Sequence, residues 1–275
     1  MPELPEVETV KKVLSGLVIG KRIRDVDVRC EKMIKNTDPK IFMDTLVGQK
    51  ITNIRRYGKY LFFDFENNTV VSHLRMEGKY NYYDTDMQTS KHDHVIFWFD
   101  DNSVLMYNDT RKFGTMELVD LKSEMSLKSV NKLGIEPYSD KLTLEYLRSK
   151  IKGRSITIKQ FLLDQTIITG LGNIYVDEVL FAAYVHPCTK VNKLNDEDLK
   201  KIIKYSNSII NMAIKGGGTT IKSFSVSGGS DGNFQHQIRM YGHAGEKCDR
   251  CLSTIEKIKV GGRGTCFCPK CQVEK

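Results

Sequence analysis

The sequence predicts an α+β protein built from two unlike halves. Apolar residues recur at helical spacing over residues 6–19, and short strand signals separated by tight turns follow to about residue 120. Helical patterns then run through residues 142–215, and paired cysteines lie near the end of the chain. We therefore expect an N-terminal helix with an antiparallel β-sandwich, linked to a helical domain that carries a C-terminal β-hairpin.

The first half contains one predicted helix and a series of predicted strands. Five apolar residues define the helix, and Gly16 and Gly20 are expected to end it. The strands are rich in β-branched and aromatic residues, with turns of Asn, Asp and Glu between them. They span residues 60–65, 69–74, 95–99, 103–107 and 115–119.

A polar stretch over residues 122–141, with Gly134 and Pro137, is typical of a linker. We predict an N-terminal domain over residues 1–133 and a C-terminal domain over residues 134–275. Within the second domain we expect two helices joined by a double turn over about 155–185, a loop over about 216–236 and a zinc finger over about 240–275.

The double turn contains Gly170 and Gly172, and Asn173 is the expected N-cap of the helix that follows. A helix N-terminus behind a glycine turn presents N–H groups to an anion. An ordinary helical hairpin explains the glycines equally well, so both interpretations stay open. The 216–236 loop is rich in Gly, Ser, Thr and Asn, and its position favours a substrate lid over a linker.

Charge and composition narrow the class of protein. The net charge of +8 arises in the second half, because residues 1–141 hold 22 Lys+Arg against 22 Asp+Glu whereas residues 142–275 hold 20 against 12. A basic surface of this kind suggests a polyanionic partner. No run of about 18 apolar residues and no signal peptide is present, so we expect a protein that is neither membrane-bound nor exported.

Four of the seven cysteines have the spacing of a zinc site. Cys248 and Cys251 form one C-x-x-C pair, and Cys268 and Cys271 form the second. Two such pairs place four thiolates around a tetrahedral ion and leave no open position, which predicts one structural Zn²⁺ per chain. Cys266 could compete as a ligand, but it breaks the spacing.

Between the cysteine pairs, residues 258–267 alternate around a Gly-Gly-Arg-Gly turn, which predicts a β-hairpin with Arg263 at its tip. A hairpin needs the glycines but does not need the arginine. An arginine held away from the body of the protein suits a phosphate group.

The start of the chain carries a second chemical signal. Removal of Met1 would leave Pro2 as a secondary amine, which forms a cationic iminium with an aldehyde-like carbon. Glu3 and Glu6 follow at a helical spacing, so both carboxyls can lie beside that amine. By itself the segment is more typical of a plain helix start, with Pro5 in the first turn.

Several motifs together resemble the formamidopyrimidine-DNA glycosylases. They occur in family order, at residues 2–9, 56–60, 73–78, 108–114, the Asn173 turn and 262–265. A sister branch, the endonuclease VIII-like glycosylases, shares the proline, the helix-two-turn-helix and the zinc hairpin. Leu4 fits the formamidopyrimidine branch, since the sister branch typically has glycine there.

The resemblance implies a bifunctional glycosylase and AP lyase that removes oxidised purines, including 8-oxoguanine and formamidopyrimidines, from double-stranded DNA and cleaves at abasic sites by β,δ-elimination. Pro2 would be the nucleophile, Glu3 the proton shuttle and Glu6 its support. The enzyme would act as a monomer in the bacterial cytoplasm, on the nucleoid. The implied phosphate ligands are Lys59 and Arg263, joined by His73 and Asn173.

The damaged nucleotide has to leave the helix to reach a chain terminus. By resemblance, Met76 fills the vacated space, Phe113 wedges the stack and Arg111 donates to the orphaned base, which favours cytosine over adenine opposite the lesion. Taken singly, the two apolar residues are more typical of a core and the arginine of a solvated strand end.

The resemblance also implies a lesion pocket formed by Glu77 with Thr219, Thr220 and Ser223 of the loop. Gly218 departs from the serine of many relatives. Two alternatives stay open from the sequence: an endonuclease VIII-like enzyme for oxidised pyrimidines, and a zinc-hairpin DNA-binding protein without catalysis. The second alternative gives Pro2 and Glu3 no purpose.

Overall fold

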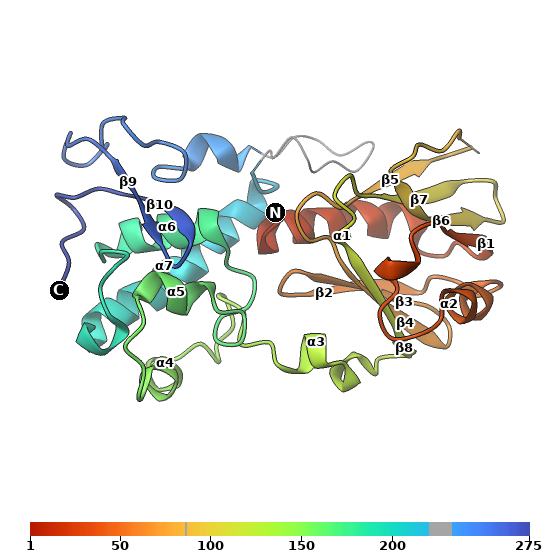
Figure 1. Cartoon of the computed structure of the whole chain (residues 1–275), viewed down its shortest axis with the longest axis horizontal. Helices are drawn as coiled ribbons and strands as arrows, with labels where there is room; N and C mark the ends of the chain where they lie inside the picture. Colours follow the sequence, from red (N-terminus) through yellow and green to blue (C-terminus); the bar gives the residue numbers. More distant parts are fainter. Residues whose placement is uncertain (86, 220–232) are drawn as a thin grey trace. The chain divides into compact units, whose positions relative to one another are not determined.

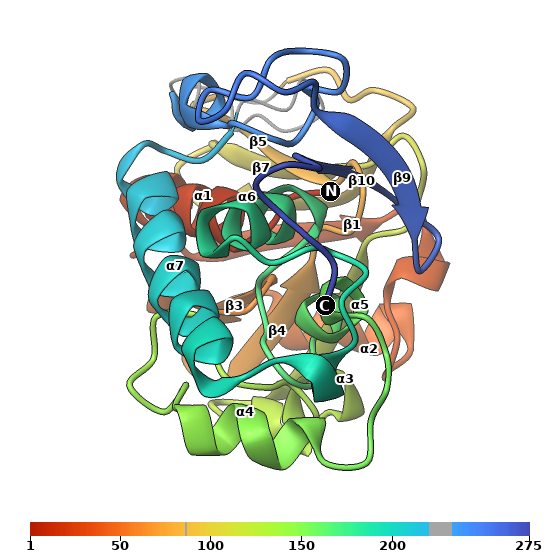
Figure 2. The same cartoon turned by 90° about the vertical axis from the view of Figure 1, so that its left-hand side faces the viewer.

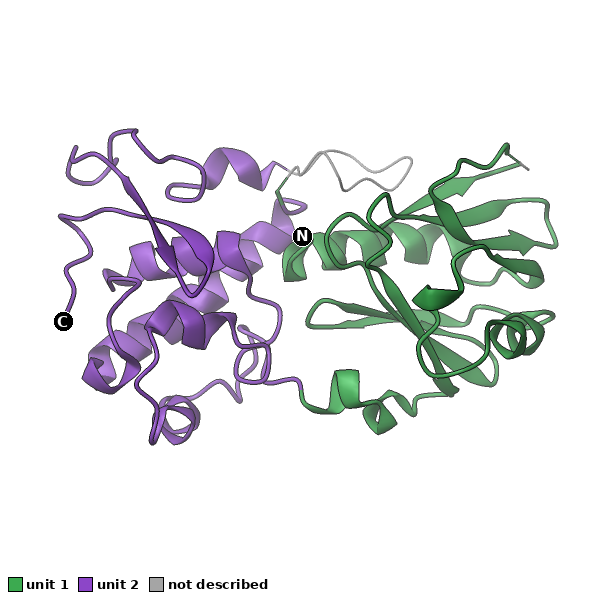
Figure 3. Ribbon diagram, in the orientation of Figure 1, with its two compact units in different colours: residues 1–132, 219–232 green, residues 133–218, 233–275 purple. Residues whose placement is uncertain are grey.

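The structure is a computed structural model, and it describes residues 1–85, 87–219 and 233–275. The chain divides into two compact units (Figure 3). Unit 1 contains residues 1–132 together with Thr219, and unit 2 contains residues 133–218 and 233–275. Among the described helices, none is long and apolar enough to cross a membrane.

Unit 1 is one long helix and a β-sandwich (Figure 1), as the sequence predicted. One four-stranded antiparallel sheet has the order β1-β6-β7-β5 and the other has the order β2-β3-β4-β8. The strands are β1 (Ile23–Val28), β2 (Asn53–Tyr57), β3 (Tyr60–Asp64), β4 (Asn68–His73), β5 (Lys79–Tyr83), β6 (Asp93–Phe99), β7 (Val104–Asn108) and β8 (Thr115–Asp120).

Helix α1 (Leu4–Val18) contributes an apolar stripe to the core that the two sheets share. Its buried members recur at helical spacing, and they pack with inward side chains of both sheets. Gly16 lies inside α1 and does not end it; the helix ends before Gly20, which has a φ of +91°. The short helix α2 (Pro39–Leu46) interrupts the region in which we expected strands alone, and Asp38 caps it.

The segment predicted as a linker contains two short helical turns, η2 (Glu124–Ser126) and α3 (Lys128–Asn131). A third short turn, η1 (Glu31–Met33), lies earlier in the chain, between β1 and α2. Unit 2 is helical. Its elements are α4 (Leu144–Ile151), α5 (Ile158–Leu163), α6 (Asn173–Ala183), η3 (Val191–Lys193), α7 (Asp196–Lys215) and η4 (Phe234–Gln237), followed by the hairpin of β9 (Glu256–Val260) and β10 (Arg263–Phe267).

Helix α6 is the centre of unit 2. It is buried over most of its length, and it packs against α5, α7 and β10 (Figure 2). Its N-cap is Gly172 and not Asn173, which is the first helical residue. The side chain of Asn173 is therefore available for a different bond, described below.

Candidate active site and nucleic-acid interface

The amino-terminal segment of unit 1 is buried, although it precedes the first helix. Pro2 is buried, and Glu3 and Glu6 are 3% and 1% exposed. One carboxylate oxygen of Glu6 accepts the Glu3 backbone N–H at 2.9 Å. Its other oxygen accepts the N–H and the hydroxyl of Thr219, at 2.8 and 3.1 Å. Glu6 therefore links the start of the chain to Thr219, which belongs to unit 1 although it follows α7 in the sequence.

Charged side chains surround the α-amino group. Burial lowers the pKa of the Met1 amine. The Lys59 cation lowers it further, whereas the carboxylates of Glu3, Glu6 and Glu77 raise it. Burial and the Lys59 cation favour the neutral, nucleophilic form of the amine, whereas the three carboxylates favour its charged form.

Lys59 lies in a tight turn that the sheet holds in register. Tyr57 of β2 pairs with Tyr60 of β3, and the intervening Gly58 has a φ of +57°, as a type II′ turn requires. Arg56 donates to the Gly58 carbonyl at 3.1 Å and to Glu8 of α1 at 2.8 Å. The turn is thereby fixed against α1, and Lys59 itself is only 5% exposed.

His73 is neutral in the folded protein. Burial, with Arg75 and Lys59 nearby, lowers the pKa of its imidazole to about 3. Its Nδ1 accepts the Arg75 N–H at 2.9 Å, which places the ring proton on Nε2 as a hydrogen-bond donor. The ring packs edge-on against Tyr60, with 4.5 Å between centroids.

Two loops of the sandwich carry the predicted DNA-reading residues. The 74–78 loop, between β4 and β5, carries Met76 and Glu77. The 109–114 loop, between β7 and β8, carries Arg111 and Phe113.

None of the three predicted reading side chains is part of the core. Phe113 is 50% exposed, and Met76 is half-buried. The Arg111 guanidinium lies 4.7 Å from the Phe113 ring centroid and 3.9 Å from the Glu77 carboxylate. The structure brings Arg111, Phe113 and Glu77 together on unit 1.

In unit 2, α6 holds the turn of the zinc hairpin. The Asn173 side-chain amide donates to the Gly264 carbonyl at 2.8 Å. Gly261 and Gly262 form the turn, with φ of +55° and +79°, so Arg263 is exposed as the first residue of β10 and lies beside the tip rather than at it.

A buried ion pair, which sequence reasoning missed, joins α5, α6 and the hairpin. Lys159 Nζ lies 2.6 Å from Asp177 Oδ1 and 3.4 Å from the Gly264 carbonyl, and Lys159 is 0% exposed. Asp177 Oδ2 accepts the Cys266 N–H at 3.0 Å. Burial raises the pKa of Asp177 to about 6, and Lys159 opposes this.

Glu178, the residue after Asp177, was also missed. Its carboxylate accepts the N–H groups of Arg239, Met240 and Tyr241 at 3.0, 2.8 and 3.0 Å. It thus anchors to α6 the segment that leads into the zinc finger. Isolated Lys, Asp and Glu in a helical pattern usually indicate a solvated face, so no local signal marked these three residues.

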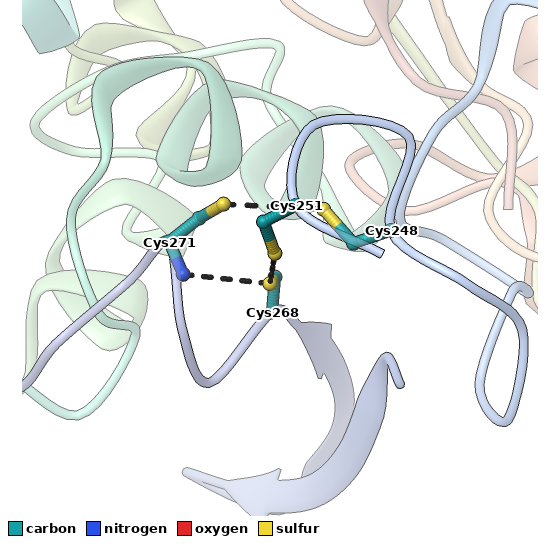
Figure 4. Close-up of side chains that lie close together, drawn as sticks. All are labelled: Cys248, Cys251, Cys268 and Cys271. Carbon is teal, nitrogen blue, oxygen red and sulfur yellow. Dashed lines mark hydrogen bonds between the residues drawn. The ribbon is translucent and has the colours of Figure 1, made fainter. Parts of the chain in front are cut away.

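The four predicted zinc ligands converge at the base of the hairpin (Figure 4). All four Sγ atoms of Cys248, Cys251, Cys268 and Cys271 lie within 4.8 Å of one another. The Sγ atoms of Cys248 and Cys271 are 3.9 Å apart, and those of Cys251 and Cys268 are 3.4 Å apart. Tetrahedral Zn–S bonds of about 2.3 Å bring sulfurs to about this separation. The cluster fits one structural Zn²⁺, and Cys266 is not part of it.

The structure places Thr219 but not the rest of the predicted loop contacts, because Thr220 and Ser223 lie outside the described residues.

Comparison with known proteins covers nearly the whole chain. Residues 1–116 match the family described as the formamidopyrimidine-DNA glycosylase N-terminal domain, residues 133–225 match the H2TH domain of the same glycosylases, and residues 245–273 match a zinc finger found in FPG and IleRS. The formamidopyrimidine-DNA glycosylase of Listeria monocytogenes is 46% identical over 99% of this chain and 100% of its own. That of Lactobacillus helveticus is 48% identical over 99% of each chain.

Solved structures agree with these matches. A Lactococcus lactis FPG variant in complex with Fapy-dG-containing DNA has a TM-score of 0.93 and 40% identity, over 99% of this chain and 100% of that one. The L. lactis protein with abasic-site DNA gives a TM-score of 0.92 at the same identity and coverage. A further complex, also at 0.92, 40% and the same coverage, contains DNA with an oxidized pyrimidine.

Proposed function

The chain belongs to the formamidopyrimidine-DNA glycosylase family and is a bifunctional glycosylase and AP lyase, and on that premise we propose how its own residues carry out the reaction. We propose that its substrates are double-stranded DNA containing 8-oxoguanine, formamidopyrimidines or abasic sites. It would act as a monomer in the cytoplasm, on the nucleoid. The relatives' complexes with Fapy-dG and abasic DNA support the substrate class.

Pro2 is the proposed nucleophile after Met1 is removed. Its nitrogen attacks C1′ of the damaged nucleotide, the glycosidic bond breaks, and the base leaves with a proton. The amine loses its own proton and the sugar opens to an iminium. Elimination then breaks the C3′–O bond and afterwards the C5′–O bond, and water releases the enzyme. The burial of Pro2 supports this role, because a buried site disfavours the charged form of an amine.

Glu3 and Glu6 are the proposed acid–base and support pair. Glu3 delivers and takes protons during ring opening and base departure, because it directly follows the nucleophile. Glu6 holds the Glu3 backbone with one oxygen and Thr219 with the other. A fixed backbone keeps the catalytic carboxyl at a constant distance from the amine.

Lys59 and Arg263 are the proposed ligands of the phosphates that flank the lesion. His73 would add an uncharged N–H donor, and Asn173 the amino end of α6. The rigid turn that carries Lys59, and the bonds that fix the hairpin beside Arg263, support these assignments.

Met76, Phe113 and Arg111 are the proposed space-filler, wedge and reader of the opposite base. Arginine has donors only, so it suits the acceptors of cytosine. Glu77 and Thr219 would contact the extruded base, as would Thr220 and Ser223. Oxidised pyrimidines are a second candidate substrate class, since a relative is seen with such DNA. Matched duplexes with 8-oxoguanine or thymine glycol would rank the two classes.

One observation carries the proposal: a buried Pro2-Glu3 start among Glu6, Lys59 and Glu77. Borohydride should trap a covalent complex between the processed protein and 8-oxoguanine duplex, because it reduces an iminium to a stable amine. One extra residue before Pro2 should abolish trapping and leave duplex binding intact. Intact-mass measurement of each protein confirms which amino terminus is present, and undiminished trapping by the extended form would remove Pro2 from the mechanism.

A further inference from the structure

One buried carboxylate organises the 109–114 loop. Asp109 is 0% exposed, and its Oδ1 accepts the Arg111 N–H at 3.0 Å. Its Oδ2 accepts the N–H groups of Phe113 and Gly114, both at 2.8 Å, and its carbonyl accepts the Lys112 N–H at 3.2 Å. Every backbone amide from residue 111 to residue 114 therefore donates to the same amino acid.

These bonds hold Lys112 in a backbone conformation that residues other than glycine disfavour. Lys112 has a φ of +56°, in the left-handed region that L-residues other than glycine rarely adopt. Such a conformation persists where the surrounding bonds determine it. Lys112, in this left-handed conformation, separates Arg111 from Phe113, and the Arg111 guanidinium lies beside the Phe113 ring.

Asp109 is itself anchored to the neighbouring strand region. Its N–H donates to the His92 carbonyl at 3.0 Å, and its own carbonyl accepts Nε2–H of His94, also at 3.0 Å. His94 is 3% exposed. The position of the loop is therefore fixed by hydrogen bonds to the sheet region rather than by solvent-exposed contacts.

Tyr107 connects this loop to the 74–78 loop. The 74–78 loop ends at Gly78 and the 109–114 loop at Gly114, and both glycines lie against the buried Tyr107 hydroxyl. A Cβ at Gly114 would lie 1.7 Å from that oxygen, and a Cβ at Gly78 would lie 2.0 Å from it. One phenol thus fills the space beneath both loops, and neither glycine can gain a side chain unless Tyr107 moves.

We propose that Asp109 and Tyr107 are positioning residues, which hold the loop of Met76 and the loop of Arg111 and Phe113 as one preassembled reader of the opposite strand. The inference rests on the proposed reading role of Arg111. Preassembly removes the need to order these side chains when DNA binds, so Asp109 acts on base selectivity through Arg111 and not through contact with DNA.

The test compares Asp109→Asn and Gly114→Ala with Arg111→Ala. Asparagine keeps the shape of Asp109 but turns an N–H₂ group toward backbone donors. We expect faster amide hydrogen exchange at residues 111–114 in the DNA-free protein, and a fall of about fivefold or more in the ratio of 8-oxoguanine excision opposite C to that opposite A. Asp109→Asn combined with Arg111→Ala should lower the ratio no further than the larger single change.

Gly114→Ala should also speed exchange of the Gly78 amide, in the other loop, because the new methyl displaces Tyr107. Asp198→Asn is the first control, since Asp198 is a buried carboxylate of unit 2 that accepts the Asn195 N–H and belongs to neither loop. Gly16→Ala is the second, because its Cβ would meet nothing within 4 Å.

Exchange that stays unchanged at residues 111–114, or that rises equally in β3 and β4, would overturn the positioning role of Asp109. A full C-over-A ratio in Asp109→Asn would overturn it as well, provided that Arg111→Ala loses the ratio. If Arg111→Ala keeps the ratio, the proposed reading role fails, and the exchange at residues 111–114 alone decides for or against positioning. If the exchange rate of the Gly78 amide is unchanged in Gly114→Ala, the proposed positioning role of Tyr107 is wrong.

Discussion

The two units fix their proposed DNA contacts by different means. In unit 1 the contacts lie on tight turns between strands of a sandwich with one extensive apolar core, and side chains such as Arg56 and Asp109 bind the turn backbones. In unit 2 the hairpin beside Arg263 has a small apolar cluster made largely of cysteines. Its position depends on four thiolates, the Lys159–Asp177 pair and Asn173. A segment with little core needs a metal and buried charges to keep its shape.

Loss of the metal is the harshest test of this difference. Cys268→Ser should release the zinc, disorder residues 256–267 and weaken DNA binding, because a structural zinc site contributes about 10–16 kcal/mol to the folding of its module. Hydrogen exchange in the sandwich of unit 1 should not change. Metal content per chain and exchange mapping provide the measurements.

Cys266→Ser is the matched control, since Cys266 lies in β10, two residues before Cys268, and outside the thiolate cluster. It should keep one zinc per chain. Zinc lost from this variant but kept by Cys268→Ser would show that the ligand set is wrong.

The buried ion pair should give the next largest effect. Lys159→Met leaves Asp177 buried without its cation, which costs about 3–5 kcal/mol of unfolding free energy. Adding Asp177→Asn should restore most of that loss, because the amide oxygen still accepts the Cys266 N–H. Urea unfolding followed by probes in unit 2 measures both.

Lys200→Met is the control for this pair. Lys200 is an exposed lysine bound to Glu197 on the surface of α7, and its loss should not change stability. Equal effects of the two lysine substitutions would contradict a specific role for the buried pair.

Acid should weaken unit 1 through His73. The imidazole has a pKa of about 3 when folded and about 6.5 when unfolded, so below pH 6.5 the unfolded chain binds the extra proton. Stability is therefore complete above pH 6.5 and falls as pH drops, by about 2 kcal/mol at pH 5 from this group. His73→Gln should flatten the dependence between pH 6.5 and 5, as urea unfolding at each pH will show. An equally steep loss in His73→Gln would assign it to other groups.

The smallest effect concerns salt. Lys59→Ala and Arg263→Ala, one from each unit, should each lower the slope of log affinity against log salt by about one, for damaged and undamaged duplex alike. His73→Gln should leave the slope unchanged, because the neutral imidazole carries no charge. A slope that falls for Lys59 but not for Arg263 would confine the phosphate grip to unit 1.

Local patterns predicted the parts of the structure that local chemistry determines. The α1 stripe, most strands of unit 1 and the four thiolates follow from residue spacing, and their elements are confirmed. Helix α2 was missed because its Asp-Pro start was embedded among strand signals. The N-cap of α6 was placed one residue late, since Gly172 serves as well as Asn there.

The remaining contacts pair residues that are distant in sequence. Lys159 donates to the Gly264 carbonyl, 105 positions away in the sequence, and no local pattern around either residue predicts this contact. The roles of Lys59, His73, Met76 and Arg111 came from family resemblance rather than from periodicity, and they stay predictions, as does the division of roles between residues 1–133 and 134–275.

The bond between Glu6 and Thr219 spans 213 positions, and it bears on the order of events during synthesis. The first 132 residues contain the whole sandwich, so this unit can collapse while the ribosome is still translating the helical region. Thr219 emerges only after α7. The amino-terminal carboxylates therefore reach their final arrangement late in translation, and a nascent chain has a folded scaffold well before its proposed catalytic terminus is complete.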